Sequence, residues 1–219
     1  MKVMRSFQEK GSVAYAILHE KLVAILRNVD KGELRDILQA CYEGGIRVAE
    51  IALNSPEALH LLDLATQQYG AKMIFGAGTV TSPKAAKLAI QAGARFVITP
   101  VVLPDVIQTC KDEDITVIAG AFSPTEIHQA YSLGADVVKV FPAASLGASY
   151  FREIRGPMPE IPLAAVGGVT LENGAAFLRA GAKVLGVGSA LTPKDILYRK
   201  DWEGLKELAR RFKELTISC

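Results

Sequence analysis

Four short segments of the chain share one form: EGGIRVA at residues 43–49, QAGARFV at 91–97, SLGADVV at 132–138 and RAGAKVL at 179–185. In each segment a glycine follows a stretch with helical periodicity, and residues typical of a strand begin within two positions. Glycine at the end of a helix supplies the left-handed conformation that closes it. The repeated form therefore predicts a chain in which helices and strands alternate.

Eight short runs, each bounded by Gly or Pro, predict the strands. Most of the runs are apolar on both faces instead of alternating, which is typical of parallel strands that are covered on both sides. They lie at residues 22–27, 47–53, 72–78, 95–100, 115–122, 136–142, 162–168 and 183–189.

The stretches between these runs predict helices. Ser-Pro pairs predict helix starts at Ser55, Ser82 and Ser123, because a serine hydroxyl caps the first amide groups and proline fits the first helical position. Thr170 predicts the start of a further helix that ends at Gly181.

Eight strands, each followed by a helix, predict an α/β fold of the (β/α)8 TIM-barrel class. We expect one compact domain over residues 1–219, with an N-terminal helix in 1–21 (helical at roughly 4–20), a barrel core at 22–191 and a C-terminal helix at 192–219. An open doubly wound sheet is the alternative. It normally has fewer strands, and its glycine fingerprint is missing.

The composition excludes several functional classes. Among 219 residues, 25 Lys and Arg stand against 23 Asp and Glu, and half of the residues are apolar. Such a chain can bury a full core, and its net charge of +2 provides no basic footprint for nucleic acid. Charged residues interrupt the N-terminal segment every few positions, so we expect neither a signal peptide nor a membrane span.

The cysteines and histidines are isolated. Cys41, Cys110 and Cys219 form no C-x-x-C pair, which predicts free thiols and a cytoplasmic protein. The three histidines have none of the spacings of a metal site, and no acidic cluster falls at the strand ends, so we expect no metal.

Lys139 is the clearest chemical signal in the sequence. It lies in the strand run DVVKVFP at 136–142, surrounded by valines and Phe141. Burial lowers the pKa of a lysine, and a neutral amine can attack a carbonyl and form a Schiff base. The alternative is a structural lysine whose tip pairs with a carboxylate.

Glu50 lies on the second predicted strand. Strand alternation places Val48, Glu50, Ala52 and Asn54 on one face, opposite an apolar face. We therefore expect Glu50 and Asn54 to point into the barrel, where a carboxylate can relay protons directly or through water. A salt bridge from Glu50 to Arg27 or Lys139 is the structural alternative.

Glycine clusters follow the last two strands. Gly167 and Gly168 follow the seventh, and Gly188 and Ser189 end the eighth. Barrels often bind phosphate at these two loops through backbone amides. The alternative is that these glycines only form tight turns. The segment GAGTV at 76–80 is a weak nucleotide fingerprint, because its third glycine is absent.

Taken in order, these motifs resemble one known family. EIALNSP with Glu50, GAGTV with Thr79, ITP with Pro100, KVFPAA with Lys139, AVGGV and VGSAL are similar to the motifs of the 2-keto-3-deoxy-6-phosphogluconate (KDPG) and 4-hydroxy-2-oxoglutarate (KHG) aldolases. The resemblance runs from about residue 22 to 191.

The resemblance implies a class I aldolase that is a homotrimer and needs neither cofactor nor metal. It implies that Lys139 forms a Schiff base with the substrate and that Glu50 is the general acid and base. The implied partners are pyruvate and a phosphorylated 2-keto-3-deoxy sugar acid. Substrate-binding roles are implied for Arg27 (substrate anion), for Thr79, Pro100 and Phe141 (pyruvate), and for Gly167, Gly168, Gly188 and Ser189 (phosphate).

Asn54, for which we also expect a substrate-binding role, departs from the pattern of many phosphogluconate-type members, which carry there an arginine that helps hold the pyruvate carboxylate. The LNSP form resembles the 2-keto-3-deoxy-6-phosphogalactonate (KDPGal) aldolases, which accept the C4 epimer, so the C4 preference stays open between the two. A phosphate-binding isomerase or synthase on the same barrel, or a barrel that only binds a phosphorylated ligand, are the more distant alternatives.

Overall fold

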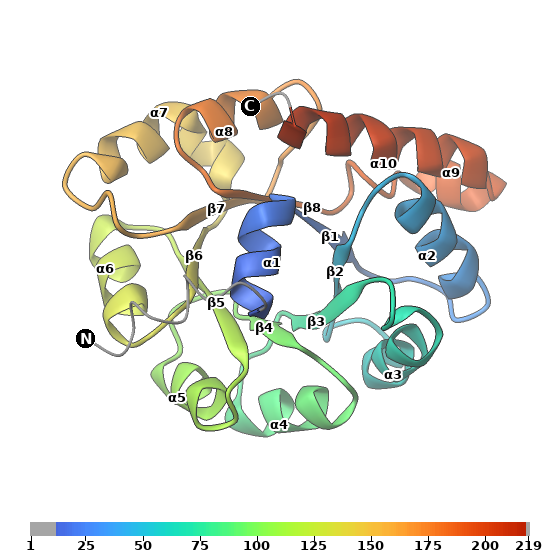
Figure 1. The fold of residues 1–219 in the computed structure, drawn as a ribbon, viewed down its shortest axis with the longest axis horizontal. Coiled ribbons are helices and arrows are strands. Elements are labelled where there is room, and N and C mark those ends of the chain that lie inside the picture. The colour runs from blue at the N-terminus through green and yellow to red at the C-terminus, as the bar shows by residue number, and fades with distance from the viewer. Residues whose placement is uncertain (1–11, 218–219) are drawn as a thin grey trace.

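The computed structural model describes residues 12–217. Eight parallel strands form a closed barrel in chain order (Figure 1), which confirms the predicted (β/α)8 barrel in a single compact domain. Each predicted strand is present within slightly shorter bounds. The strands are β1 (Leu22–Leu26), β2 (Val48–Ala52), β3 (Ile74–Gly78), β4 (Phe96–Ile98), β5 (Thr116–Ala121), β6 (Val137–Val140), β7 (Leu163–Val166) and β8 (Val184–Val187).

Helices surround the barrel on its outside, and one helix lies across its centre in Figure 1. The central helix is α1 (Val13–Glu20), which precedes β1. The outer helices are α2 (Leu34–Glu43), α3 (Ala58–Tyr69), α4 (Pro83–Gln91), α5 (Pro104–Asp112), α6 (Pro124–Ser132), α7 (Ala143–Arg155), α8 (Gly174–Arg179), α9 (Lys194–Arg199) and α10 (Trp202–Ile217).

The glycines of the repeated segment close four helices as predicted. Gly45, Gly93, Gly134 and Gly181 all have a left-handed backbone, with φ between +93° and +106°. A side chain at such a position clashes with the following carbonyl, at a cost of roughly 1–2 kcal/mol. The repeat therefore marks the turn by which each helix leads into the next strand.

Two of the three predicted serine caps are present. The hydroxyls of Ser82 and Ser123 accept hydrogen bonds from the third amide of α4 and α6. The prediction for Ser55 is wrong, because α3 begins at Ala58 without a side-chain cap. The Ser55 hydroxyl instead accepts a hydrogen bond of 2.9 Å from the amide of Asn28, which follows β1.

Three further boundaries differ from the prediction. Helix α8 begins at Gly174, because Asn173 binds the Thr170 amide and the Gly168 carbonyl in a turn before it. The predicted C-terminal helix is two helices, α9 and α10, separated at Lys200 by a left-handed backbone with φ +54°. Of the predicted N-terminal helix, residues 13–20 form α1 and the part before residue 12 lies outside the described residues.

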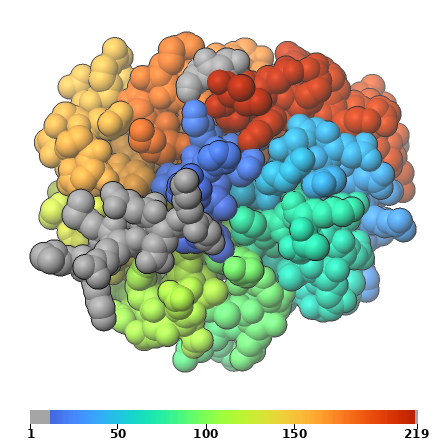
Figure 2. Space-filling model, viewed as in Figure 1, coloured from blue at the N-terminus to red at the C-terminus, as the bar shows by residue number. Residues whose placement is uncertain are grey.

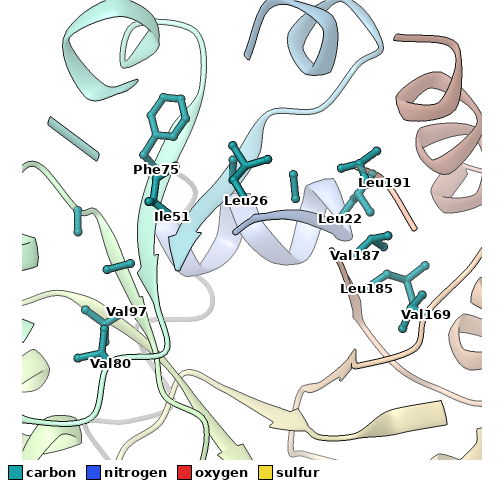
Figure 3. Close-up of a cluster of buried hydrophobic side chains, with 14 of the residues drawn as sticks. Leu22, Leu26, Ile51, Phe75, Val80, Val97, Val169, Leu185, Val187 and Leu191 are labelled. Carbon is teal, nitrogen blue, oxygen red and sulfur yellow. The ribbon is translucent and has the colours of Figure 1, made fainter. Parts of the chain in front are cut away.

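The core has two layers. The larger layer lies between the strands and the outer helices, and Figure 3 shows part of it around Leu26, Ile51 and Leu185. The smaller layer fills the barrel itself, where Ile17 of α1 contributes to the same cluster as Val48 and Phe96. Figure 2 shows the same face as Figure 1, with the blue atoms of α1 in the middle of the ring. Helix α1 thus closes the amino-terminal end, so the opposite end is the open one.

Candidate active site

The barrel interior holds one buried acid and one buried base. Glu50 on β2 is 2% exposed and Lys139 on β6 is 7% exposed. Both line an inner cavity of about 10 Å³, which is close to the space that one water molecule requires. The other lining residues are apolar, namely Val23, Ile25, Ile98, Ile118, Ala164, Val166, Val184 and Gly186.

The apolar lining shifts the pKa of both groups. Burial raises the pKa of the Glu50 carboxyl, while the charges of Lys139 and then Arg27 oppose that shift. Burial lowers the pKa of the Lys139 amine, while the charge of Glu50 opposes the shift and that of Arg27 adds to it. Desolvation penalises the charged form of each group, so burial favours the neutral form of the amine and of the acid relative to exposed side chains.

Neither group has a close polar partner. Among residues 12–217, no ion pair within 4.0 Å joins Lys139 to Glu50, and Glu50 Oε2 is fully buried without a hydrogen-bond partner. The Lys139 Nζ lies 4.8 Å from the centre of the Phe141 ring. The salt bridge that the sequence left open for Glu50 is therefore not formed, and Lys139 does not have the paired tip of a structural lysine.

Arg27 and Thr79 meet at the rim of the barrel. They follow β1 and β3, and the Arg27 guanidinium donates a hydrogen bond of 3.3 Å to the Thr79 hydroxyl. Thr79 has a left-handed backbone with φ +58°, which is rare for a β-branched residue and is found at functional sites. The Arg27 guanidinium therefore lies at the carboxyl end of β3, the strand next to β2, which carries Glu50.

The prediction that Asn54 points into the barrel is wrong. Strand β2 ends at Ala52, and the Ser55 amide bonds the Ala52 carbonyl to form a turn. Asn54 is exposed and lines, together with Thr79, a separate surface depression of about 670 Å³. Strand alternation fails here because the strand has already ended.

The loop after β4 packs directly on β5. A Cβ built on Gly120 would lie 2.7 Å from the Val101 nitrogen and closer still to the Pro100 carbonyl. The buried Thr99 hydroxyl accepts from the Gly120 amide at 3.1 Å and donates to the Val101 carbonyl at 2.7 Å. Gly120 and Thr99 therefore hold Pro100, and the sequence suggested no such role for Gly120.

Gly167 and Gly168 form a turn against the loop that follows Lys139. Both have a left-handed backbone, with φ +92° and +71°. A Cβ on Gly167 would lie 2.9 Å from the Phe141 ring, and one on Gly168 would lie 2.5 Å from the Ala144 Cβ. This turn therefore requires glycine for conformation and packing, whatever else its amides bind.

The loop after β8 is more open. A Cβ on Gly188 would lie 3.6 Å from Ile25, an ordinary contact, and Ser189 is exposed. Ile25 also lines the inner cavity, so Ile25 connects this loop to the cavity that holds Lys139 and Glu50. Among residues 12–217, no group of three or more His, Cys, Asp or Glu side chains is arranged to hold a metal ion.

The model of the KDPG and KHG aldolase family matches residues 13–208. The chain belongs to this family. It is an aldolase, a carbon–carbon lyase, and this membership weighs against the isomerase, synthase and binding-protein alternatives. None of the helices within residues 12–217 combines the length and apolar character needed to span a membrane.

Both phosphogalactonate and phosphogluconate aldolases are similar to this aldolase. The 2-dehydro-3-deoxy-6-phosphogalactonate aldolase of Escherichia coli is 34% identical over 78% of this chain and 83% of the relative. The 2-dehydro-3-deoxy-phosphogluconate aldolase of Pseudomonas aeruginosa is 28% identical over 96% of both chains. A solved KDPG aldolase from Legionella pneumophila, with pyruvate captured as a covalent carbinolamine, is 25% identical over 92% of this chain and 98% of its own, with a TM-score of 0.85.

Proposed function

We propose that this aldolase is a class I enzyme that cleaves KDPG to pyruvate and glyceraldehyde 3-phosphate through a Schiff base on Lys139. The observation that carries the proposal is a lysine amine buried in an apolar barrel with a lowered pKa and without a close anionic partner. A neutral amine is the form that attacks a carbonyl. The pyruvate carbinolamine in the Legionella relative supports the same chemistry here.

The reaction begins when the Lys139 amine attacks the C2 ketone and forms a carbinolamine. Loss of water gives a protonated imine. A base then removes the C4 hydroxyl proton, the C3–C4 bond breaks, and its electron pair moves into the imine to form an enamine. Glyceraldehyde 3-phosphate leaves, the enamine is protonated at C3, and hydrolysis releases pyruvate and the free amine.

Glu50 is the proposed acid and base for these proton transfers. Burial raises its pKa and so favours the protonated acid, and proton transfer by a positioned group contributes about 10²–10⁴-fold to the rate. The inner cavity lined by Glu50 and Lys139, about 10 Å³, is close to the space that one water molecule requires. We propose that such a water carries protons between the carboxyl group and the reacting atoms.

The remaining residues are proposed to bind the substrate. Thr79, Pro100 and Phe141 line the pyruvate pocket, and Arg27 binds a substrate anion. The hydrogen bond from Arg27 to Thr79 and the position of Phe141 over the Lys139 amine support this arrangement. The phosphate binds at the two glycine loops, through Gly167, Gly168, Gly188 and Ser189, where backbone amides need no side-chain charge.

Borohydride reduction in the presence of pyruvate tests the mechanism. We expect a stable adduct on the peptide that contains Lys139 and a loss of both adduct and activity in the Lys139→Arg variant. Lys183→Arg, which alters an exposed lysine just before β8, is the matched control. An adduct on a different lysine, or full activity in Lys139→Arg, contradicts the proposal.

The KDPGal reaction is the second candidate. It is favoured by Asn54 in the LNSP turn and by the 34% identity to the E. coli KDPGal aldolase. Steady-state kinetics on the two C4 epimers decides between them, because the preferred epimer has the higher kcat/KM. Cleavage of 4-hydroxy-2-oxoglutarate to pyruvate and glyoxylate is a proposed side activity that the same assay measures.

We also propose that the enzyme is a cytoplasmic homotrimer. Val101 and Phe122, which follow neighbouring strands, are 54% and 48% exposed, and exposed apolar residues at one rim are typical of a protein interface. The free, buried thiols of Cys41 and Cys110 suit a reducing compartment. Light scattering should give three times the 23.5 kDa of one chain, and a monomer mass contradicts the trimer.

A further inference from the structure

Gly78, the last residue of β3, lies against the Glu50 carboxylate of the neighbouring strand β2. The two strands pair in parallel, with Glu50 beside Gly76 and Ala52 beside Gly78. A Cβ built on Gly78 would lie 2.8 Å from Glu50 Oε2 and closer still to Oε1 and Cδ. The carboxylate therefore occupies the volume that any side chain at position 78 would fill.

The backbone of Gly78 does not itself require glycine. The glycines with a left-handed φ in residues 12–217 do not include Gly78, so alanine can adopt its conformation. Its glycine identity is therefore explained by the space that Glu50 needs.

Packing against β3 limits the positions open to the carboxylate. Within the described part of the chain no protein group forms a hydrogen bond to Glu50, and its Oε2 is fully buried. Buried carboxylates are normally oriented by hydrogen bonds. Here the strand backbone at position 78 limits where the carboxylate can lie on its β3 side.

We propose that Gly78 is a positioning residue: by having no side chain, it seats the Glu50 carboxylate at the cavity shared with Lys139. This inference rests on the proposed role of Glu50 in proton transfer. Gly78 touches no reacting atom, and it acts only through Glu50. The consequence is that the acid–base group is placed by the shape of the neighbouring strand.

The first test is Gly78→Ala, with Gly76→Ala as the matched control. Both variants add one methyl group to the inner face of β3, but at position 76 the methyl meets the Phe96 ring at 2.5 Å instead of the carboxylate. We expect Gly78→Ala to lower kcat by about 10²-fold, to change KM less than threefold, and to shift the pH profile of kcat. Gly76→Ala should lower thermal stability without moving the pH profile.

The second test restores the space. Glu50→Asp shortens the acid by one methylene group, so the Gly78→Ala/Glu50→Asp double variant has room for the new methyl. We expect the double variant to be several-fold more active than the product of the two single effects predicts. Purely multiplicative losses, full kcat in Gly78→Ala, or equal pH profiles in Gly78→Ala and Gly76→Ala overturn the proposal.

A stability measurement covers the case in which Gly78→Ala does not fold. In the Glu50→Ala background the new methyl group has space, so Gly78→Ala should then lower Tm only a little. A large loss of Tm both in wild type and in Glu50→Ala contradicts the proposal that Gly78 leaves space for the Glu50 carboxylate. Borohydride trapping of pyruvate on wild-type Lys139 separates the outcomes further. A failed trap removes the proposed mechanism, whereas a normal trap with an unaffected Gly78→Ala removes only the positioning role.

Discussion

The two halves of the barrel interior are built by the same strands but serve opposite purposes. The amino-terminal half is filled by apolar side chains such as Val48 and Phe96 and is closed by Ile17 from α1. The carboxyl-terminal half holds Glu50 and Lys139. The comparison shows how apolar surroundings act on the two ionisable groups, because the apolar lining of their cavity desolvates them and shifts both pKa values.

The largest effect is expected from removing a large side chain from the apolar layer at the amino-terminal half of the barrel interior. Phe96 is fully buried and fills the space that Gly76 leaves on the neighbouring strand. Phe96→Ala should lower the free energy of unfolding by about 3–5 kcal/mol, the usual cost of removing a buried aromatic ring. Denaturant titration measures this loss. Leu133→Ala, at a 37% exposed position, is the control. Equal losses of unfolding free energy in the two variants contradict a stabilising role for the apolar layer around Phe96.

Truncating Ile17, the side chain of α1 that closes the amino-terminal end of the barrel, should have the next largest effect. Ile17 is 0% exposed and belongs to the interior cluster, whereas the neighbouring Leu18 is only partly buried against it. Ile17→Ala should cost about 2–5 kcal/mol of unfolding free energy, and Leu18→Ala less. Thermal or denaturant unfolding of both variants checks the order. A smaller loss for Ile17→Ala than for Leu18→Ala shows that α1 does not close the barrel.

Glu50→Gln should separate stability from activity. The raised pKa of Glu50 means that the folded state favours the protonated acid, so the ionised form costs stability once pH rises above the unfolded-state pKa. Glutamine carries no such charge. We expect Glu50→Gln to be more stable than wild type at neutral pH, equally stable near pH 4, and about 10²–10⁴-fold less active.

The measurement is denaturant unfolding of wild type and Glu50→Gln across this pH range, beside steady-state kinetics. A stability difference that shrinks as pH rises has the wrong sign for a desolvated carboxyl group. It would indicate that attraction to Lys139 outweighs burial.

The smallest expected effect is a shift in the pH dependence of Schiff-base formation. Burial lowers the pKa of Lys139, so the neutral amine is present at a lower pH than for an exposed lysine, and adduct formation with pyruvate should rise below the ordinary lysine pKa. Val166→Thr adds a hydroxyl to the cavity lining and should move this rise to higher pH. Borohydride trapping as a function of pH measures both, and an unchanged midpoint in Val166→Thr contradicts the link to burial.

Much of this molecule follows from local sequence signals. The strand runs and the four cap glycines predict the barrel because side-chain periodicity and a left-handed φ are properties of a few consecutive residues. Glu50 and Lys139 could be found in the same way, since each is a charged residue inside an apolar strand. A prediction failed where a group distant in the chain replaced a local partner. The Ser55 hydroxyl was expected to cap the helix that follows it, but it accepts a hydrogen bond from the Asn28 amide instead.

The assembly of the site depends on how the chain folds. The order of strands and helices, the glycine turns and the two ionisable residues on the barrel's inner face follow from the amino-acid sequence, and its motifs indicated the family. It did not show that β3 gives the Glu50 carboxylate its space at Gly78, or that α1 closes the far end of the barrel. The physical reason is that desolvation and close packing depend on atoms brought together from separate strands, and no single stretch of chain contains them.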